Sequence, residues 1–416
     1  MMNRFHWSLI SLGLLAFMWW TFFAKIVDSD EGDSYPKEHY LEDISKIYCD
    51  MGTAALKRGD FTKAIKSYQE TVAMRPAWLE GYDHLGIAYE LNNQPELAVK
   101  TYAQATSINP QFIDYRLYGN KLPTRPIPLK PLRSIEWTGE NLSGKKIFVY
   151  AEKDLSTTLM FCRLLPVLRT HATHVYFKPQ ESLIPLIKAA KFGVVLCNNQ
   201  TNITELDVDY HTSLLSLQHY LGLSIEDLNA HDAYLKINKE KVAAFHKNFF
   251  NNSDIKVGIA WNPEHYMPGV KNNNFSPSLF VPLSTIPGVR LYILQKSANN
   301  AHLILESKSK ITDLSEELKD MTDQAVAIEN LDLLISADAT LATLAGALHK
   351  QTWFLIPIVN DWRWLDYWNK NTSIWFDNFK KVHQASGKNW QPAFNTAFSK
   401  LQELVSNKDA NRSSIT

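Results

Sequence analysis

A repeat interval of 34 residues constrains the N-terminal part of this chain more than any other feature. The matched pairs are Gly52 and Gly86, Ala64 and Ala98, Tyr68 and Tyr102, and Pro76 and Pro110. Small residues let two antiparallel helices approach closely, an aromatic ring wedges between repeats, and proline stops a helix. The interval therefore predicts two stacked helical hairpins.

This period and these positions are those of tetratricopeptide repeats. We expect an all-α array over residues 38–120. Two repeats leave apolar faces open, so a helix at about 38–46 and the segment Gln111–Tyr118 are predicted to cap the ends. Such arrays bind a protein partner through one face or dock on a neighbouring domain, and the shortness of this one favours docking.

Composition excludes several classes of function. Lys+Arg and Asp+Glu both number 43, so the chain has no net basic field and nucleic acid is not an expected partner. Cys49, Cys162 and Cys197 are far apart and lack the spacing of metal ligands, and we expect buried free thiols. No metal and no cofactor is predicted.

An uncharged apolar run opens the chain. Trp7 to Ala24 spans 18 residues without a charge, about the length that crosses a bilayer. A cleaved signal peptide needs small residues before the cut, where this chain has bulky Phe22, and Trp19 and Trp20 suit a membrane interface. We therefore predict a cytoplasmic tip and transmembrane signal anchor over residues 1–28, with a cleaved signal or a buried helix as the alternatives.

The charges beside this run set its predicted orientation. Arg4 precedes it, whereas Lys25 follows it amid several acidic residues. The bias predicts a single-pass protein with a cytoplasmic N-terminus and its bulk in the periplasm or a lumen.

After a proline-rich linker over residues 121–135, the chain alternates β-branched apolar runs with helical patterns. The predicted strands are Ile147–Ala151, His174–Phe177, Gly193–Cys197, Lys256–Trp261, Arg290–Gln295, Leu331–Asp338 and Thr352–Ile356. Helices are expected at about Thr158–Arg169, Leu183–Ala190 and 238–248. This alternation predicts two Rossmann-like α/β halves, 136–250 and 251–405, with a ligand cleft at the carboxyl ends of the strands and a flexible tail over 406–416.

Residues 136–405 resemble the C-terminal module of bacterial proteins that fuse tetratricopeptide repeats to a family 9, heptosyltransferase-like glycosyltransferase domain. The matching stretches are EWTGENLSGKKIFVYAE, FCRLLPVL, DYHTSLLSL, VGIAWNPEH, LYILQK, IENLDLLISAD, LAGAL and DWRW. The resemblance implies a GT-B fold and the transfer of a sugar from a nucleotide-sugar donor to a saccharide or protein acceptor.

The resemblance also implies a donor site at the end of one strand. Asp338 ends an apolar run, and the helix expected over Ala339–Ala347 would direct its N-terminus into the cleft, where helix amides bind phosphate. The implied donor-binding residues are Asp338, Ala339, Thr340, Thr343, Gln295 and Lys296. The alternatives are that Asp338 is only a helix N-cap and that Gln295 and Lys296 belong to a solvated loop.

Several positions depart from the family pattern. Thr157 stands where the family has its general base, and a threonine cannot accept a proton at neutral pH. Asp154 is not expected to reach the same point, and both it and Glu152, at a strand end, are weak substitutes. No catalytic residue is therefore assigned.

The donor side has departures of its own. Ala339 replaces a threonine, Thr343 replaces a histidine, and the loop Asn272–Asn274 lacks an Arg-Ser pair. The sequence thus favours a catalytically degenerate module for binding or assembly, with an active glycosyltransferase as the alternative.

We predict that residues 7–24 remain in the mature protein as a membrane helix, because the residues before Lys25 do not suit cleavage. N-terminal sequencing of membrane-extracted protein should give a terminus before Trp7. A mature terminus near Lys25 would contradict the prediction.

Overall fold

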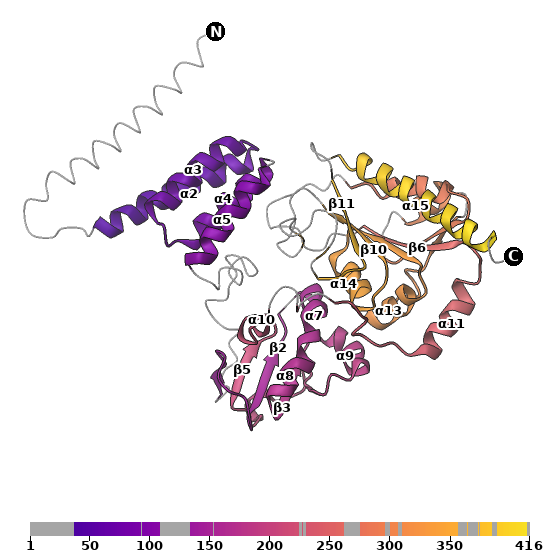
Figure 1. Ribbon diagram of the computed structural model, residues 1–416, viewed down its shortest axis with the longest axis horizontal. Coiled ribbons are helices and arrows are strands. Elements are labelled where there is room, and N and C mark those ends of the chain that lie inside the picture. The colour runs from indigo at the N-terminus through magenta and orange to yellow at the C-terminus, as the bar shows by residue number, and fades with distance from the viewer. Residues whose placement is uncertain are drawn as a thin grey trace, which may run out of the picture. The chain divides into compact units, whose positions relative to one another are not determined.

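A computed structural model describes residues 37–92, 94–108, 134–152, 154–223, 227, 230–261, 275–295, 300–306, 310–356, 364, 373, 375–384 and 389–413. The chain divides into two compact units, Met1–Asn109 and Pro110–Thr416 (Figure 1). The predicted membrane helix, the segment 111–118 and most of the linker lie outside the described residues. Within those residues, no helix has both the length and the apolar character needed to cross a bilayer.

Four helices form the described part of the repeat unit. They are α2 (Lys37–Lys57), α3 (Phe61–Met74), α4 (Leu79–Leu91) and α5 (Pro95–Ile108), and each packs on the next. The expected capping helix at 38–46 is not a separate element: α2 runs through it without a break into the first repeat. No residue in this stretch interrupts a helix, so the cap and the repeat helix form one element.

Glycine–tyrosine contacts hold each helical hairpin together. A Cβ added at Gly52 would lie 2.6 Å from the ring of Tyr68, and one at Gly86 would overlap the ring of Tyr102. The Tyr68 ring also lies 5.3 Å from the ring of His84 in the next repeat. The tyrosines therefore pack within a repeat as well as between repeats.

The first α/β half contains a parallel sheet of five strands in the order β1-β5-β2-β3-β4. The strands are β1 (Ile135–Glu136), β2 (Lys146–Tyr150), β3 (His174–Lys178), β4 (Val195–Leu196) and β5 (Tyr210–Ser213), and the helices are α7 (Leu155–Phe161), α8 (Leu165–His171), α9 (Ile184–Ala190) and α10 (Ser216–Tyr220). The single helix expected over 158–169 is broken between α7 and α8 by a 3₁₀ turn, because Pro166 cannot donate a helical hydrogen bond.

The second half contains a parallel sheet of six strands in the order β11-β10-β9-β6-β7-β8. The strands are β6 (Ile255–Ala260), β7 (Val289–Ile293), β8 (Ile311–Asp313), β9 (Leu333–Ser336), β10 (Thr352–Ile356) and β11 (Phe379–His383). The helices are α11 (Lys239–Phe249), η6 (Pro277–Thr285), α12 (Asn300–Glu306), α13 (Met321–Glu329), α14 (Ala339–Ala347) and α15 (Gln391–Ser413). Because α15 continues to Ser413, most of the expected flexible tail is helical. Two parallel α/β halves in tandem confirm the predicted double Rossmann-like, GT-B-like arrangement.

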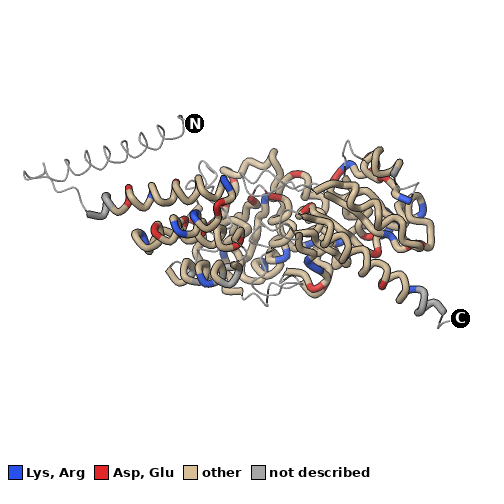
Figure 2. Tube along the Cα trace, turned by 90° about the horizontal axis from the view of Figure 1, so that it is seen from above, with Lys and Arg blue, Asp and Glu red and all other residues tan. Residues whose placement is uncertain are grey.

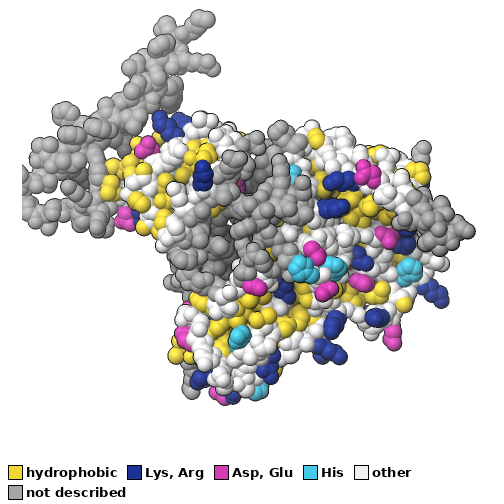
Figure 3. All heavy atoms as spheres, in the orientation of Figure 1, with side chains coloured by type: hydrophobic (Ala, Val, Ile, Leu, Met, Phe, Trp, Pro, Cys, Tyr) yellow, Lys and Arg dark blue, Asp and Glu magenta, His cyan; other side chains and the backbone are white. Residues whose placement is uncertain are grey.

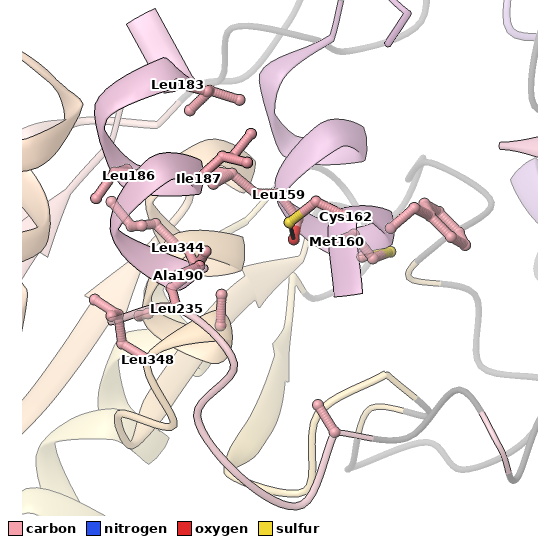
Figure 4. Close-up of a cluster of buried hydrophobic side chains, with 14 of the residues drawn as sticks. Leu159, Met160, Cys162, Leu183, Leu186, Ile187, Ala190, Leu235, Leu344 and Leu348 are labelled. Atoms are coloured by element: carbon pink, nitrogen blue, oxygen red, sulfur yellow. Dashed lines mark hydrogen bonds between the residues drawn. The ribbon is translucent and has the colours of Figure 1, made fainter. Parts of the chain in front are cut away.

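Alternate residues of the second sheet enter two different cores. Leu333 and Ile335 of β9 belong to a core under η6 and α15, whereas Leu334 faces a second core with α13 and α14. The second core is continuous with the first half, since it includes Val149 of β2 and Phe177 of β3. Figure 4 shows part of this shared core between α7, α9 and α14. The two halves therefore share one of these two cores, while the core under η6 and α15 belongs to the second half.

Charged residues of both signs are interspersed along the chain. Figure 2 shows Lys and Arg alternating with Asp and Glu over both units, without an extended stretch of one sign.

We predict that Gly86→Ala lowers the free energy of unfolding of the repeat unit by about 1–3 kcal/mol, the usual range for overpacking. The added methyl would overlap Tyr102, and this exceeds the gain of about 0.5–1 kcal/mol from replacing a helical glycine. Denaturant unfolding followed by helical circular dichroism measures the change. Gly81→Ala in the same helix is the control, because its nearest neighbours, Thr71 Cγ2 and Val72 Cγ1, lie at 3.1 Å and are aliphatic. Equal stability of the two variants would contradict the prediction.

Candidate functional site

In each α/β half, one helix begins with an aspartate just after the carboxyl end of a strand. Asp154 follows β2 and caps α7, where its carboxylate accepts from the amides of Ser156 at 3.3 Å and Thr157 at 3.0 Å. Asp338 follows β9 and caps α14, accepting from the amide of Leu341 at 2.9 Å. The N-cap interpretation of Asp338 is therefore confirmed, and its role in donor binding stays a prediction.

A buried hydrogen bond joins the first turns of these two helices. The hydroxyl oxygens of Ser156 on α7 and Thr343 on α14 are 2.9 Å apart, and both side chains are fully enclosed. Thr343 is the position where the resemblance puts a donor-binding histidine. Here its hydroxyl instead fixes the two halves against each other.

The position of the family's base is a hydrogen-bond donor in this structure. The Thr157 hydroxyl donates to Asp154 Oδ2 at 2.5 Å and is buried. The expectation that Asp154 does not reach this point is wrong, because an N-cap residue folds its side chain back over the first turn of its helix. A carboxylate is therefore present beside Thr157, and it accepts from two amides and one hydroxyl.

Glu152, the other candidate substitute for the base, forms hydrogen bonds at the carboxyl ends of the strands. Glu152 Oε1 accepts from the amide of Leu215, beyond β5, at 3.3 Å. The backbone carbonyl of Glu152 accepts from Gln180 Nε2. Glu152 thus joins the loops that follow β2, β3 and β5.

The remaining donor-side residues are partly accounted for by internal contacts. Thr340 is buried on the first turn of α14, and Ala339 beside it is partly exposed. Gln295 Oε1 accepts from the amide of Trp261 at 2.7 Å, so this side chain joins the ends of β6 and β7. Lys296 and the loop Asn272–Asn274 lie outside the described residues.

The matching stretch DWRW, residues 361–364, is described only at Trp364. This ring is buried, with its centroid 4.6 Å from Phe354 and 5.8 Å from Phe379. Packing therefore accounts for it, while Trp362 and Arg363 lie outside the described residues.

A third group of residues, not identified from the sequence, lines the seam between the halves at the other end of α7. Tyr234 donates its hydroxyl to the carbonyl of Leu159 at 2.8 Å and its amide to Ala347 at 3.1 Å. Arg163 Nη1 and the amide of Ala230 both donate to the carbonyl of Trp375, at 3.0 and 2.9 Å. Burial raises the pKa of Tyr234 and lowers the pKa of Arg163. Arg163 belongs to the matching stretch FCRLLPVL, but nothing in the sequence indicates its partners, which are far away along the chain.

The cysteines are buried free thiols, as predicted. Cys49 Sγ lies 3.4 Å from His84 Nδ1, a pairing that can activate a thiol. Burial, with a smaller effect from Glu80, nevertheless raises the pKa of Cys49 to about 12, so it is no thiolate nucleophile at neutral pH. Over the described ranges, no three His, Cys, Asp or Glu side chains gather as metal ligands.

Comparison with known proteins confirms the repeats. The tetratricopeptide repeat family profile matches residues 45–77 and 79–112. No curated protein sequence matches the chain.

Among solved structures, a glycosyl transferase of family 9 from Veillonella parvula is 12% identical, with a TM-score of 0.44, over 59% of this chain and 87% of its own. The E. coli ADP-heptose heptosyltransferase II is 10% identical, with a TM-score of 0.45, over 64% and 99%. A mutant O-GlcNAc transferase from Thermobaculum terrenum is 12% identical, with a TM-score of 0.27, over 87% and 80%. Likeness at this level does not transfer any of these activities to the chain.

We predict that Ser156 and Thr343 are energetically coupled. Ser156→Ala and Thr343→Val should each lower the free energy of unfolding by about 1–3 kcal/mol, because each removes the buried hydrogen bond between the two hydroxyls. The double variant should lose less than the sum, with a coupling of about 0.5–1.5 kcal/mol. Denaturant titrations of the four proteins measure it. Strict additivity would show that the hydroxyls do not bond.

Proposed function

We propose that this chain is a membrane-anchored tetratricopeptide protein whose glycosyltransferase-like module is catalytically degenerate and serves binding or assembly. The observation that carries the proposal is the buried bond between Ser156 and Thr343. It closes the first turns of α7 and α14 on each other, where the resemblance puts the base and the donor diphosphate.

The polar groups at this point are already used inside the fold. Transfer needs a base that removes a proton from the acceptor, and positioned general-base catalysis is worth roughly 10²–10⁴-fold. Thr157 donates a hydrogen bond instead of accepting a proton, and Asp338 accepts a hydrogen bond from the amide of Leu341. Ala339 has no hydroxyl to offer a phosphate. These features support a module that does not turn over a nucleotide sugar.

A second candidate, an active glycosyltransferase, has one specific observation in its favour. The carboxylate of Asp154 lies against the Thr157 hydroxyl, so an acidic group occupies the neighbourhood of the family's base. In that case a nucleotide-sugar would bind at Asp338, Thr340 and Lys296. Neither candidate requires a cofactor.

The repeats supply a surface for a protein partner. Met51 on α2 is 44% exposed, whereas Leu85, which occupies the same place in the second repeat, is 5% exposed. Ile47 and Leu41 on α2 are also exposed, and Figure 3 shows apolar side chains at the surface of the repeat unit. The first repeat therefore exposes an apolar face of α2, whereas the equivalent face of α4 in the second repeat is buried. An apolar helix of a partner protein would fit the exposed face.

Residues 7–24 support the membrane part of the proposal through their uncharged run. With the N-terminus in the cytoplasm, the bulk of the chain would lie in the periplasm or a lumen. Nucleotide sugars are made in the cytosol, so a periplasmic module would have no donor. This location agrees better with binding than with transfer.

We expect no sugar transfer and weak or absent nucleotide-sugar binding, measured by calorimetry and a hydrolysis assay with a panel of nucleotide sugars. Asp154→Asn and Asp338→Asn keep the capping oxygen, so they test charge without removing the cap. Asp320→Asn is the matched control, since Asp320 caps α13 in the same way. Wild-type turnover that survives in Asp320→Asn and disappears in Asp154→Asn would establish the transferase instead.

A further inference from the structure

The guanidinium of Arg163 has two buried nitrogens without a hydrogen-bond partner. Nη1 donates to the carbonyl of Trp375 at 3.0 Å, which fixes the orientation of the group. Nε and Nη2 are enclosed and bond to nothing. Buried charged donors are almost always paired, because leaving one unpaired costs the full penalty of removing it from water.

Among the described residues, the groups found around Arg163 are aromatic rings and no carboxylate. Its Cζ lies 5.7 Å from the ring centre of Tyr234 and 5.5 Å from that of Phe376. The charged or titratable groups that act on it are Tyr234 and Cys162, and burial is the main influence on its pKa, which is lowered. Aromatic faces stabilise the positive charge, but they leave the N–H donors of the Nε–Nη2 edge unsatisfied.

The two unpaired nitrogens are the ones that act together as a fork. Nε–H and one Nη2–H point in the same direction along one edge of the planar group, at the spacing of two oxygens of a carboxylate or phosphate. We propose that the Nε–Nη2 edge of Arg163 binds an oxyanion, a carboxylate or phosphate group, at the seam between the two α/β halves.

This site is separate from the strand-end site of the proposed function. Asp154 begins α7, whereas Arg163 lies just beyond the end of that helix. Phe376, which covers one face of the guanidinium, packs on Gly346 in the last turns of α14, where an added Cβ would lie 2.7 Å from its ring. The oxyanion site is therefore at the opposite end of the α7–α14 pair.

Binding there would join the two halves. Arg163 belongs to the first half, Trp375 and Phe376 to the second, and Tyr234 to the segment that crosses between them. An oxyanion that accepts hydrogen bonds from Nε and Nη2 removes the free-energy cost of burying these donors unpaired. It can do so only while the two halves are packed together. Occupancy should therefore stabilise the folded module.

The test is the thermal midpoint of the full-length chain, titrated with sodium phosphate in one series and sodium acetate in another, at constant ionic strength set by chloride. Three variants accompany the wild type. Arg163→Met removes the charge and the fork, Arg163→Lys keeps the charge and removes the fork, and Arg169→Lys is the matched control. Arg169 lies on α8 and also donates to a backbone carbonyl, that of Ala172 at 2.8 Å.

We expect a saturable rise of the wild-type and Arg169→Lys midpoints with at least one of the two anions. The apparent affinity should fall at least about tenfold in Arg163→Lys, since one charged hydrogen bond is lost, and the effect should vanish in Arg163→Met. A response to phosphate or to acetate alone identifies the group that the fork prefers. Two results would overturn the proposal: no saturable shift in the wild type, or the same shift in Arg163→Met. The strand-end variants Asp154→Asn and Asp338→Asn should leave this response unchanged, which separates it from the proposed function.

Discussion

The packing of α7 on α14 is the contact on which the rest of the α/β unit depends. Each helix follows a central strand of its own sheet, and each contributes to the same apolar core. Leu159 of α7 and Leu344 of α14 are completely buried in it. Because burial of apolar surface is the main stabilising term, neither half can lose this contact without exposing part of its own interior. The Ser156–Thr343 bond adds a polar contact that fixes how the two helices align.

The same contact uses polar groups of the strand ends inside the fold, which bears on the proposed loss of catalysis. Catalysis needs donors that stay unpaired until charge develops in the transition state. At the first turns of α7 and α14, the two aspartates and the hydroxyls of Ser156, Thr157 and Thr343 bond to one another or to nearby amides. Such groups stabilise the ground state of the protein.

Much of the architecture follows from sequence patterns. The repeat interval fixes the paired glycines and tyrosines, and apolar β-branched runs identify β2, β6, β9 and β10 to within a few residues. The helix predicted over Ala339–Ala347 has those bounds in the structure. These elements are recognisable because their own residues supply most of the burial that makes them form.

The elements that sequence reasoning missed depend on their neighbours instead. β5 reads Tyr-His-Thr-Ser and has no apolar run, yet it is an inner strand that pairs with both β1 and β2. The contact between the Asp154 carboxylate and the Thr157 hydroxyl arises because Asp154 is the N-cap residue of α7. A spacing of three residues in the sequence does not by itself show this contact.

Arg163 depends still more on tertiary structure. Its carbonyl partner is 212 residues away in sequence, so the stretch FCRLLPVL, although it contains Arg163, does not show what this side chain contacts.

The two ends of the α7–α14 pair differ in a way that favours binding over catalysis. At the strand ends, the polar groups named above have partners inside the protein. Beyond the end of α7, the guanidinium of Arg163 has two donors without one. Folding has already removed those donors from water, so a ligand that supplies two oxygens gains their hydrogen bonds at little further desolvation cost to the guanidinium, and only the anion itself must still lose water. Free energy is therefore available for recognition at the seam, in a module whose strand-end groups are committed to holding the fold together.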